Sequence, residues 1–475
     1  MRLMNRRRRI LVLLICCTSL LIVSLDNTIV NVALPSLGRD LSAPVSGLQW
    51  TIDAYTLTLA SLLMLSGSTG DRVGRRRVFQ IGLLVFTGGS LLCSIAPTLE
   101  WLIAFRALQA VGGSMLNPVA LSIITNTFTD PRERAQAIGV WGGVVGISMA
   151  LGPVVGGLLT DGVGWRAIFW INVPIGLVAV LLAWLFVPES RSEKPRRIDP
   201  VGQALVIVLL ASLTYGIIEG QGVGWTSDLI IGCFVVSALS LAALIVYEPR
   251  REEPLIDVRF FHSAPFSGAA AIAVASFAAL GMFLFVNTLY LQNIRGLSAL
   301  DAGLCMLPTA LATLIFGPLS GRLVGARGPR VPLLAGGVCI AVAGVLLAQV
   351  TLVTPIPVLL GIYLVFGLGF AVVNPPITNT AVSGMPLSQA GVAAAVASTS
   401  RQVGQSFGVA IAGSVVASAV HAPGFIRAGH VVWWIVAAYG LVVLVLALVT
   451  TTGWARATAE RTAARLAPHE PVGSP

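Results

Sequence analysis

Long apolar runs recur along almost the whole chain and constrain its fold more than any other feature. A helix needs about 20 apolar residues to cross the hydrocarbon core of a bilayer. We find fourteen such segments, at residues 10–34, 49–69, 78–97, 100–125, 135–159, 167–187, 201–218, 229–247, 266–291, 300–323, 331–350, 356–377, 398–419 and 431–452. Of the 475 residues, 56% are hydrophobic and only 11% charged, which is more apolar than a water-soluble fold of this size. The sequence therefore predicts an all-α polytopic membrane protein.

The basic residues predict how the chain is oriented. The segment before the first span, every second loop and the C-terminal tail together hold 24 of the 30 Lys and Arg residues, whereas the opposite loops hold 4. Basic loops stay on the cytoplasmic side of a membrane. We therefore expect a multi-pass protein of the cell membrane with both termini in the cytoplasm. This bias also accounts for the net charge of +10 without a nucleic-acid partner; the expected surroundings are the lipid bilayer.

The spans divide into six, two and six. We expect an N-terminal six-helix bundle at 1–187, a two-helix insertion with cytoplasmic linkers at 188–265, a C-terminal six-helix bundle at 266–452 and a cytoplasmic tail at 453–475. The segment "GPLSGRLVGARG" at 317–328 is a degenerate copy of "GSTGDRVGRRRV" at 67–78. Repeated six-helix halves are the organisation of many secondary transporters.

The segment at 67–78 places a dense charge cluster between two apolar runs. Gly67 would let a neighbouring helix approach, and Gly74 would allow a turn that a Cβ obstructs. Asp71 could face a helix N-terminus or an arginine of the other half, while Arg72 and Arg75 would hold the loop in the cytoplasm. These residues are candidates for conformational gating. The alternative is that the cluster only determines topology.

A second candidate gating segment is "GISMALGPVVGG" at 146–157. Gly152, Gly156 and Gly157 would form a smooth face for close contact with a helix of the other half, and Pro153 would add a bend. Such an interface could open and reclose. The alternative is ordinary packing of small residues.

Three charged residues fall inside the predicted spans of the N-terminal half. With about 1.5 Å of rise per residue, Asp26, Asp53 and Arg106 lie roughly 12, 6 and 9 Å below the outer ends of their spans. One carboxylate could pair with Arg106 while the other exchanges a proton, and we favour Asp26 as the proton carrier because it is deeper. Asp53 could instead recognise a cationic ligand. The alternative for the layer is a static salt bridge.

The motifs resemble those of the major facilitator superfamily, and within it those of the fourteen-helix drug:proton antiporters. The resemblance rests on Gly67–Arg76, where Thr69 replaces the usual leucine, and on "LDNTIVNVALP" (25–35), "RALQAVGGSM" (106–115), the segment at 146–157, "WRAIFWINVPIG" (165–176) and "RQVGQSFGVAIAG" (401–413). It implies the major facilitator fold and proton-driven efflux of an antibiotic or other small lipophilic compound by alternating access. The partners would be a small-molecule drug and protons. Candidate polar residues of the substrate cavity are Asn31, Gln109, Asn374 and Asn379.

Other functions are less compatible with the sequence. A proton-coupled importer of a small nutrient could use the same fold, but the motif at 146–157 resembles that of exporters. A membrane-embedded enzyme would need a convergent catalytic set, and the four histidines lie in loops, at helix ends or in the tail. The absence of a GxxxxGK[ST] motif argues against an ATP-driven pump. The six cysteines lack metal-site spacing, so we expect no metal and no cofactor.

Overall fold

The chain forms a bundle of long helices. The computed structural model describes residues 5–192, 199–251, 253–383, 385, 390–417 and 422–466, and within them every regular element is helical. The α-helices are α1 Arg6–Asp40, α2 Val45–Val73, α3 Arg75–Ser94, α4 Leu99–Thr127, α5 Pro131–Gly162, α6 Ala167–Trp170, α7 Asn172–Phe186, α8 Pro200–Val223, α9 Asp228–Tyr247, α10 Ala264–Leu289, α11 Ala299–Cys305, α12 Leu307–Arg327, α13 Arg330–Leu347, α14 Ile356–Val382, α15 Ala390–Val416, α16 Ala422–Thr450 and α17 Gly453–Leu466.

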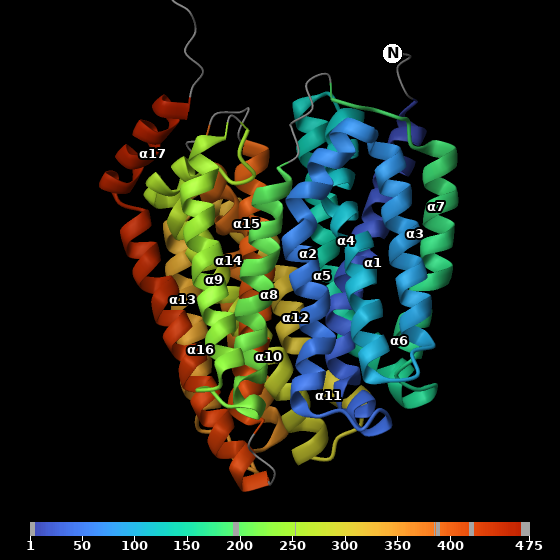
Figure 1. Ribbon diagram of the computed structural model, residues 1–475, viewed down its shortest axis with the longest axis vertical. Helices are drawn as coiled ribbons and strands as arrows, with labels where there is room; N and C mark the ends of the chain where they lie inside the picture. Colours follow the sequence, from blue (N-terminus) through green and yellow to red (C-terminus); the bar gives the residue numbers. More distant parts are fainter. Residues whose placement is uncertain are drawn as a thin grey trace, which may run out of the picture.

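The long helices run side by side between two ends of the molecule (Figure 1). The start of α1 and the helix α17 lie at one end, which we call the termini end. The short helices α6 and α11 lie at the other, which we call the far end. The basic loop between α2 and α3 belongs to the termini end, since α2 runs toward it from the far end.

Twelve helical segments among the described residues are long and apolar enough to span a membrane, so the chain is a multi-pass membrane protein. The two expected spans missing from these twelve correspond to α2 and α15. Both are long helices of the bundle, with 29 and 27 residues. Ser, Thr, Gly and Gln dilute their apolar character. The all-α fold is confirmed, whereas the count of fourteen spans stays a prediction.

Prolines break two of the expected spans. The span expected at 167–187 is divided at Ile171 into α6 and α7, and the span expected at 300–323 is divided at Met306 into α11 and α12. Pro174 and Pro308 follow these breaks closely. A proline has no N–H to bond the carbonyl four residues earlier. In contrast, α14 continues through Pro375 and Pro376.

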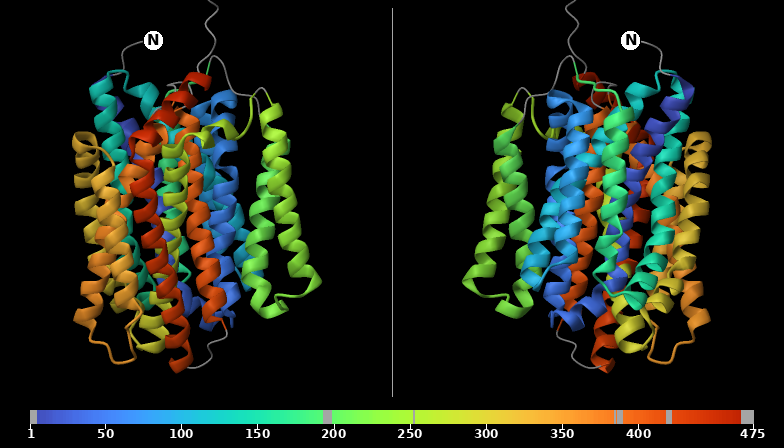
Figure 2. Two further views of the ribbon diagram at one scale, coloured as in Figure 1. Left: turned by 90° about the vertical axis from the view of Figure 1, so that its left-hand side faces the viewer. Right: turned by 90° about the vertical axis from the view of Figure 1, so that its right-hand side faces the viewer.

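The pair α8 and α9 lies at one side of the bundle (Figure 2, the green hairpin). Helix α8 packs on α2 and α15. The Nε2 of Gln203 donates to the carbonyl of Ser61 at 2.6 Å, and Trp50 Nε1 donates to Glu219 Oε1 at 2.8 Å. These bonds hold the pair against α2.

Two seams join the first helices of the chain to the last ones. In one seam, α5 packs against α11 and α12; in the other, α2 packs against α15. Within the first group, α3 packs on α4 and α1 on α5; within the second, α10 packs on α15 and α13 on α16. Helix α1 also contacts α10 and α11, so the seams are the more extensive contacts between the two groups but not the sole ones.

Candidate transport site

The three charged residues expected in one layer are all buried. Arg106 on α4 is 1% exposed, and Asp26 and Asp53 are fully covered. The guanidinium Nη1 of Arg106 lies 2.5 Å from Asp26 Oδ2. Arg106 Nε also donates to the carbonyl of Thr51 at 3.1 Å, and the guanidinium carbon lies 4.2 Å from the centre of the Tyr55 ring. Arg106 is thus held by α1 and α2.

The carboxylate of Asp26 accepts two further hydrogen bonds. Gln109 Nε2 donates to Asp26 Oδ1 at 2.9 Å, and Asn172 Nδ2 donates to the same oxygen at 3.1 Å. Gln109 also receives a bond from Arg106 and donates to Ser90 on α3. We did not predict Asn172, although its place before Pro174 in the motif at 165–176 was a signal.

This network binds together the first helices of the chain. Asp26 lies on α1, Ser90 on α3, Arg106 and Gln109 on α4, and Asn172 at the start of α7. Both oxygens of Asp26 have partners, one of which is a cation. A buried charge pair with satisfied hydrogen bonds is costly to open. The geometry therefore favours the static salt bridge for Asp26, the alternative to our first preference.

Asp53 has a different environment. Its Oδ1 accepts a bond from Thr56 of the same helix at 3.3 Å, and its Oδ2 has no hydrogen-bond partner. Among the described residues, no cation forms an ion pair with it. Ser406 of α15 lies beside its carboxyl group. Asp53 is therefore a buried acid without a counter-charge, located on the seam between α2 and α15.

Other polar contacts cross this seam near Asp53. The Nε2 of Gln49, one turn before Asp53, donates to the carbonyls of Val409 and Ala410 at 3.2 and 2.7 Å. The amide groups of Asn27 on α1 and Gln405 on α15 lie 3.4 Å apart. Separation of α2 from α15 would break the bonds of Gln49 and expose Asp53, and the contact of Asn27 with Gln405 holds α15 against α1 beside them.

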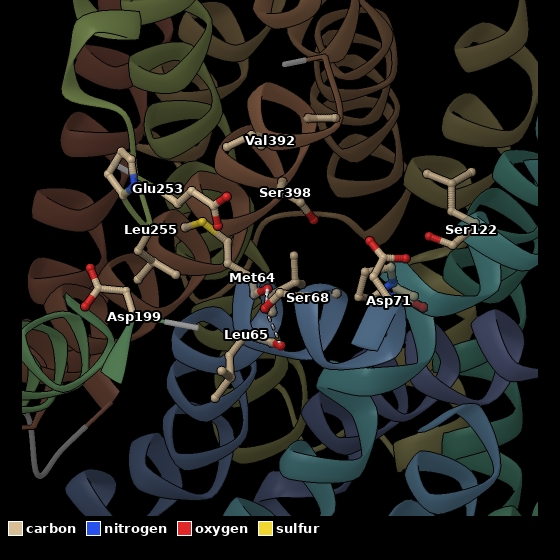
Figure 3. Close-up of a pocket in the computed structure, with 18 of the residues that line it drawn as sticks. Met64, Leu65, Ser68, Asp71, Ser122, Asp199, Glu253, Leu255, Val392 and Ser398 are labelled. Carbon is tan, nitrogen blue, oxygen red and sulfur yellow. Dashed lines mark hydrogen bonds between the residues drawn. The ribbon is translucent and has the colours of Figure 1, made fainter. Parts of the chain in front are cut away.

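A cavity of about 400 Å³ lies between α2, α4, α5 and α15 toward the termini end (Figure 3). Its wall is mostly apolar, with Leu63, Met64 and Trp141 among its residues. Asp71 and Glu253 lie on opposite sides of it, and Ser398 of α15 lies between them. A largely apolar wall with a few polar groups is typical of a small-molecule site.

The far end is closed by contacts between α5 and α11. The Oδ2 of Asp161 accepts a bond from the backbone N–H of Leu300 at 2.8 Å. A β-carbon added to Gly157 would lie 2.5 Å from Leu300 Cα, and one added to Gly303 would overlap the carbonyl of Pro153. The two helices therefore touch backbone to backbone, which only glycine allows.

The four residues of the α5 motif do not share one face. Gly157 contacts the later helices, as expected, and so does Pro153, for which we expected only a bend. Gly152 and Gly156 instead pack on Thr28 and Ile29 of α1, and this part of the expectation is wrong. The reason is helical geometry, since positions 152 and 156 are one turn apart while 157 is rotated by about 100° from 156.

The loop at Gly67–Arg75, our candidate for gating, also differs from one expectation. Asp71 pairs with Arg75 one turn later, with Nη2 to Oδ1 at 2.7 Å, and not with an arginine of the other half. Gly74 has a φ of 123°, in the region that favours glycine. A β-carbon there would lie 2.8 Å from the carboxylate of Glu189, which accepts a bond from the N–H of Arg76 at 3.1 Å. Glu189 was not predicted.

Gly67 is less restricted than we expected. An added β-carbon would lie 3.6 Å from Pro118 Cβ, an ordinary contact distance, whereas at Gly70 it would lie 2.9 Å from a Val119 methyl group. Gly67 does line the cavity, as do Asp71 and Ser68. The close approach of α2 and α4 thus requires Gly70 more than Gly67.

The four candidate residues of the substrate cavity lie outside its wall as described. Gln109 belongs to the Asp26 network. Asn31 is 3% exposed and donates to the carbonyl of Asn27 one turn earlier. Asn374 is half-buried and Asn379 exposed, both on α14. Asn117 and Ser122, on α4, are polar wall residues that we missed.

Comparison with known proteins places these features in context. A family profile described as the Major Facilitator Superfamily matches residues 16–409. The multidrug resistance protein Stp of Mycobacterium tuberculosis is 38% identical over 84% of this chain and 74% of its own length. The tetracenomycin C resistance and export protein of Streptomyces glaucescens is 34% identical over 84% and 74%. The methylenomycin A resistance protein of Streptomyces coelicolor, which the motifs had led us to expect as a relative, is 33% identical over 84% and 83%.

Two solved structures have the same fold. A bacterial homologue of the human lysosomal transporter Spinster, in an inward-facing and occupied conformation, aligns with a TM-score of 0.66 at 17% identity, covering 97% of this chain and 98% of that one. A D-xylose–proton symporter aligns with a TM-score of 0.66 at 14% identity, covering 93% and 97%. At these identities the likeness concerns the fold alone.

Proposed function

This chain belongs to the Major Facilitator Superfamily, a family of transporters and not of enzymes, and from that premise we propose that it exports a small lipophilic compound in exchange for protons. Its curated relatives include proteins named for multidrug resistance, tetracenomycin C export and methylenomycin A resistance. We propose an antibiotic as the substrate class, with methylenomycin-type compounds among the candidates. The observation that carries the proposal is the largely apolar cavity beside a seam that holds a buried, unpaired acid.

The proposal includes the organisation of the chain in the membrane. We assign fourteen spans, with α2 and α15 added to the twelve apolar segments. The halves are then 1–187 and 266–452, with 188–265 as the insertion and 453–475 as the tail. The termini end, which carries the arginine-rich loops, is the cytoplasmic end. The cavity then opens toward the cytoplasm and the contact of α5 with α11 closes the outside.

We propose that alternating access uses the two seams. In the described conformation the seam between α5 and α11 is closed at the far end through Gly157, Asp161 and Gly303. The part of the α2–α15 seam near the termini end borders the cavity. Export requires the opposite arrangement. We propose that α5 and α11 separate while the inner ends of α2 and α15 approach one another.

Asp53 is the proposed proton carrier, in place of Asp26. An ionised Asp53 lacks a counter-charge in the closed seam, so this conformation suits the neutral, protonated acid. When the seam opens toward the outside, water reaches Asp53 and can exchange its proton. The charge of Asp26, in contrast, is compensated by Arg106 without any proton.

The loop from Gly67 to Arg75 is the proposed inner latch. Asp71 and the first turns of α15 face one cavity. Closure of the inner end would bring the Asp71 carboxylate toward the N-terminal end of α15, where a negative charge is stabilised by the helix dipole. Glu189 holds the loop through its bond from the N–H of Arg76 and lies close to Gly74.

Transport by everted membrane vesicles tests the proposal. Vesicles that contain the protein and have an acidic interior are offered puromycin, methylenomycin A and tetracenomycin C, the compounds named in the resistance proteins to which this chain is similar. At least one compound should accumulate inside, and a protonophore should abolish the accumulation. Vesicles that carry a folded Asp71→Asn/Gly157→Val variant serve as the control. Loss of compound from acidic vesicles would favour the importer, and no proton-dependent movement of any compound would contradict the proposal.

A further inference from the structure

A groove of about 400 Å³ lies at the termini end between the first turns of α1 and the last turn of α7. Its wall contains two arginines of α1, Arg7 and Arg8, and three apolar residues, Leu11 of α1 and Leu185 and Phe186 of α7. The groove is thus basic at its rim and apolar at its base. It lies away from the cavity, with which it shares no wall residue.

The arginines at this rim differ from the neighbouring Arg9 in their charge partners. Arg9 forms an ion pair with Glu133 of α5. Arg8 donates through Nε to the backbone carbonyl of Phe186 at 3.2 Å, which is a neutral partner, and it forms no ion pair within the part of the chain that the structure describes. Arg7 and Arg8 are both exposed. Two guanidinium groups therefore present their charge and donors at one place.

Apolar residues continue from the groove along both helices. On α1, Arg7, Leu11 and Leu14 follow one another at helical spacing, and Leu14 is 54% exposed. On the other side of the groove, α7 has a second series at helical spacing, formed by Leu185, Leu181 and Val178. All three side chains are exposed. Two apolar stripes thus descend from the arginines into the region that faces the hydrocarbon.

We propose that the groove between α1 and α7 binds an anionic phospholipid of the cytoplasmic leaflet. A guanidinium matches a phosphate group through paired hydrogen bonds, and basic pockets at the cytoplasmic side of membrane helices favour anionic lipids. The acyl chains lie on the stripes that begin at Leu11 and Leu185. A soluble anion would use the arginines but leave the stripes unused.

The bound lipid joins two helices that also meet in the membrane core. Helix α1 carries Asp26 and α7 carries Asn172, which donates to it. A lipid that bridges α1 and α7 at the membrane surface therefore stabilises the same pair of helices that the Asp26 network holds further inside.

Native mass spectrometry of the purified full-length chain in detergent tests this inference with phosphatidylglycerol and phosphatidylcholine as probes. The wild type should bind one phosphatidylglycerol in preference to phosphatidylcholine, and Arg7→Gln/Arg8→Gln should weaken that binding about 30-fold. Arg322→Gln/Arg327→Gln removes the same charge at the termini end, from exposed positions on α12, and should leave the binding unchanged. Thermal unfolding without lipid checks that both variants are folded.

Three results would overturn the inference. Equal loss of binding in the two double variants would mean that only the overall charge matters. Equal affinity for the two lipids would mean that the groove does not select an anion. Displacement of phosphatidylglycerol by millimolar inorganic phosphate would mean that the apolar stripes contribute nothing.

Discussion

Replacement of Asp26 by asparagine tests whether the buried pair in the N-terminal half is structural. The substitution removes the negative charge 2.5 Å from Arg106 and places an NH₂ group among three donors, from Arg106, Gln109 and Asn172. Breaking a buried ion pair by removing one partner costs about 3–5 kcal/mol. We therefore expect the free energy of unfolding to fall by that amount, measured by chemical denaturation in mixed micelles.

The matched control is Asp53→Asn, which removes an acid without a cationic partner. Its cost should stay below about 1 kcal/mol, because no ion pair is broken and only the contacts with the hydroxyl groups of Thr56 and Ser406 are affected. The double variant Asp26→Asn/Arg106→Gln should recover about 1–3 kcal/mol of the loss, because the unpaired cation is gone. If Asp26→Asn unfolds at the same denaturant concentration as the wild type, the Asp26–Arg106 pair is not structural and the assignment of roles to the two acids fails.

Three further perturbations follow from the seams and the loop. Gly157→Val places side-chain atoms against the backbone of Leu300, so the outer end should stay open. The buried Thr160 of α5 then becomes accessible, and in Thr160→Cys an external thiol reagent should react several times faster with Gly157→Val than without it. Gly74→Ala forces a φ of 123° on a residue with a Cβ and crowds Glu189, so it should abolish export; Gly67→Ala, with room for a methyl group, should retain most of it. Reporter fusions after Arg77 should report the cytoplasm and fusions after Gly222 the outside; a cytoplasmic signal at Gly222 would refute the two-span insertion.

The fold could be predicted from the sequence because it depends on quantities summed along the chain. The length of the apolar runs and the distribution of the arginines required no knowledge of the packing. The sequence also predicts spans at 49–69 and 398–419, which correspond to α2 and α15, although small and polar residues dilute the apolar character of both helices and neither is among the twelve apolar segments. These two helices pack against each other.

The partners of the charged residues could be predicted only in part. The depth of each residue along its helix was sufficient to place Asp26 and Arg106 in one layer. It placed Asp53 in the same layer, so depth did not show which acid pairs with Arg106. The choice between the two acids depends on how α1, α2 and α4 are rotated about their axes, which is set by packing. The motif at 165–176 contains Asn172 but does not show that its side chain reaches Asp26, and the sequence contains no local sign that Glu189 lies beside Gly74.

The α5 motif shows the same limit. Its glycines indicated close helix contacts, and close contacts occur at all three positions. Their spacing alone did not distinguish the neighbour within the half from the neighbour across the seam. That distinction depends on the crossing of α5 with α1 on one side and with α11 on the other.

Transport by Asp53→Asn in proteoliposomes tests the proton-carrier assignment most directly. Asparagine keeps the size and much of the hydrogen bonding of a protonated acid but cannot release a proton. Using a compound that the wild type accumulates in response to a pH gradient, we predict that Asp53→Asn loses this accumulation and still exchanges the compound across the membrane at equal pH. Full accumulation driven by the pH gradient in Asp53→Asn, with equal amounts of folded protein, would contradict the account.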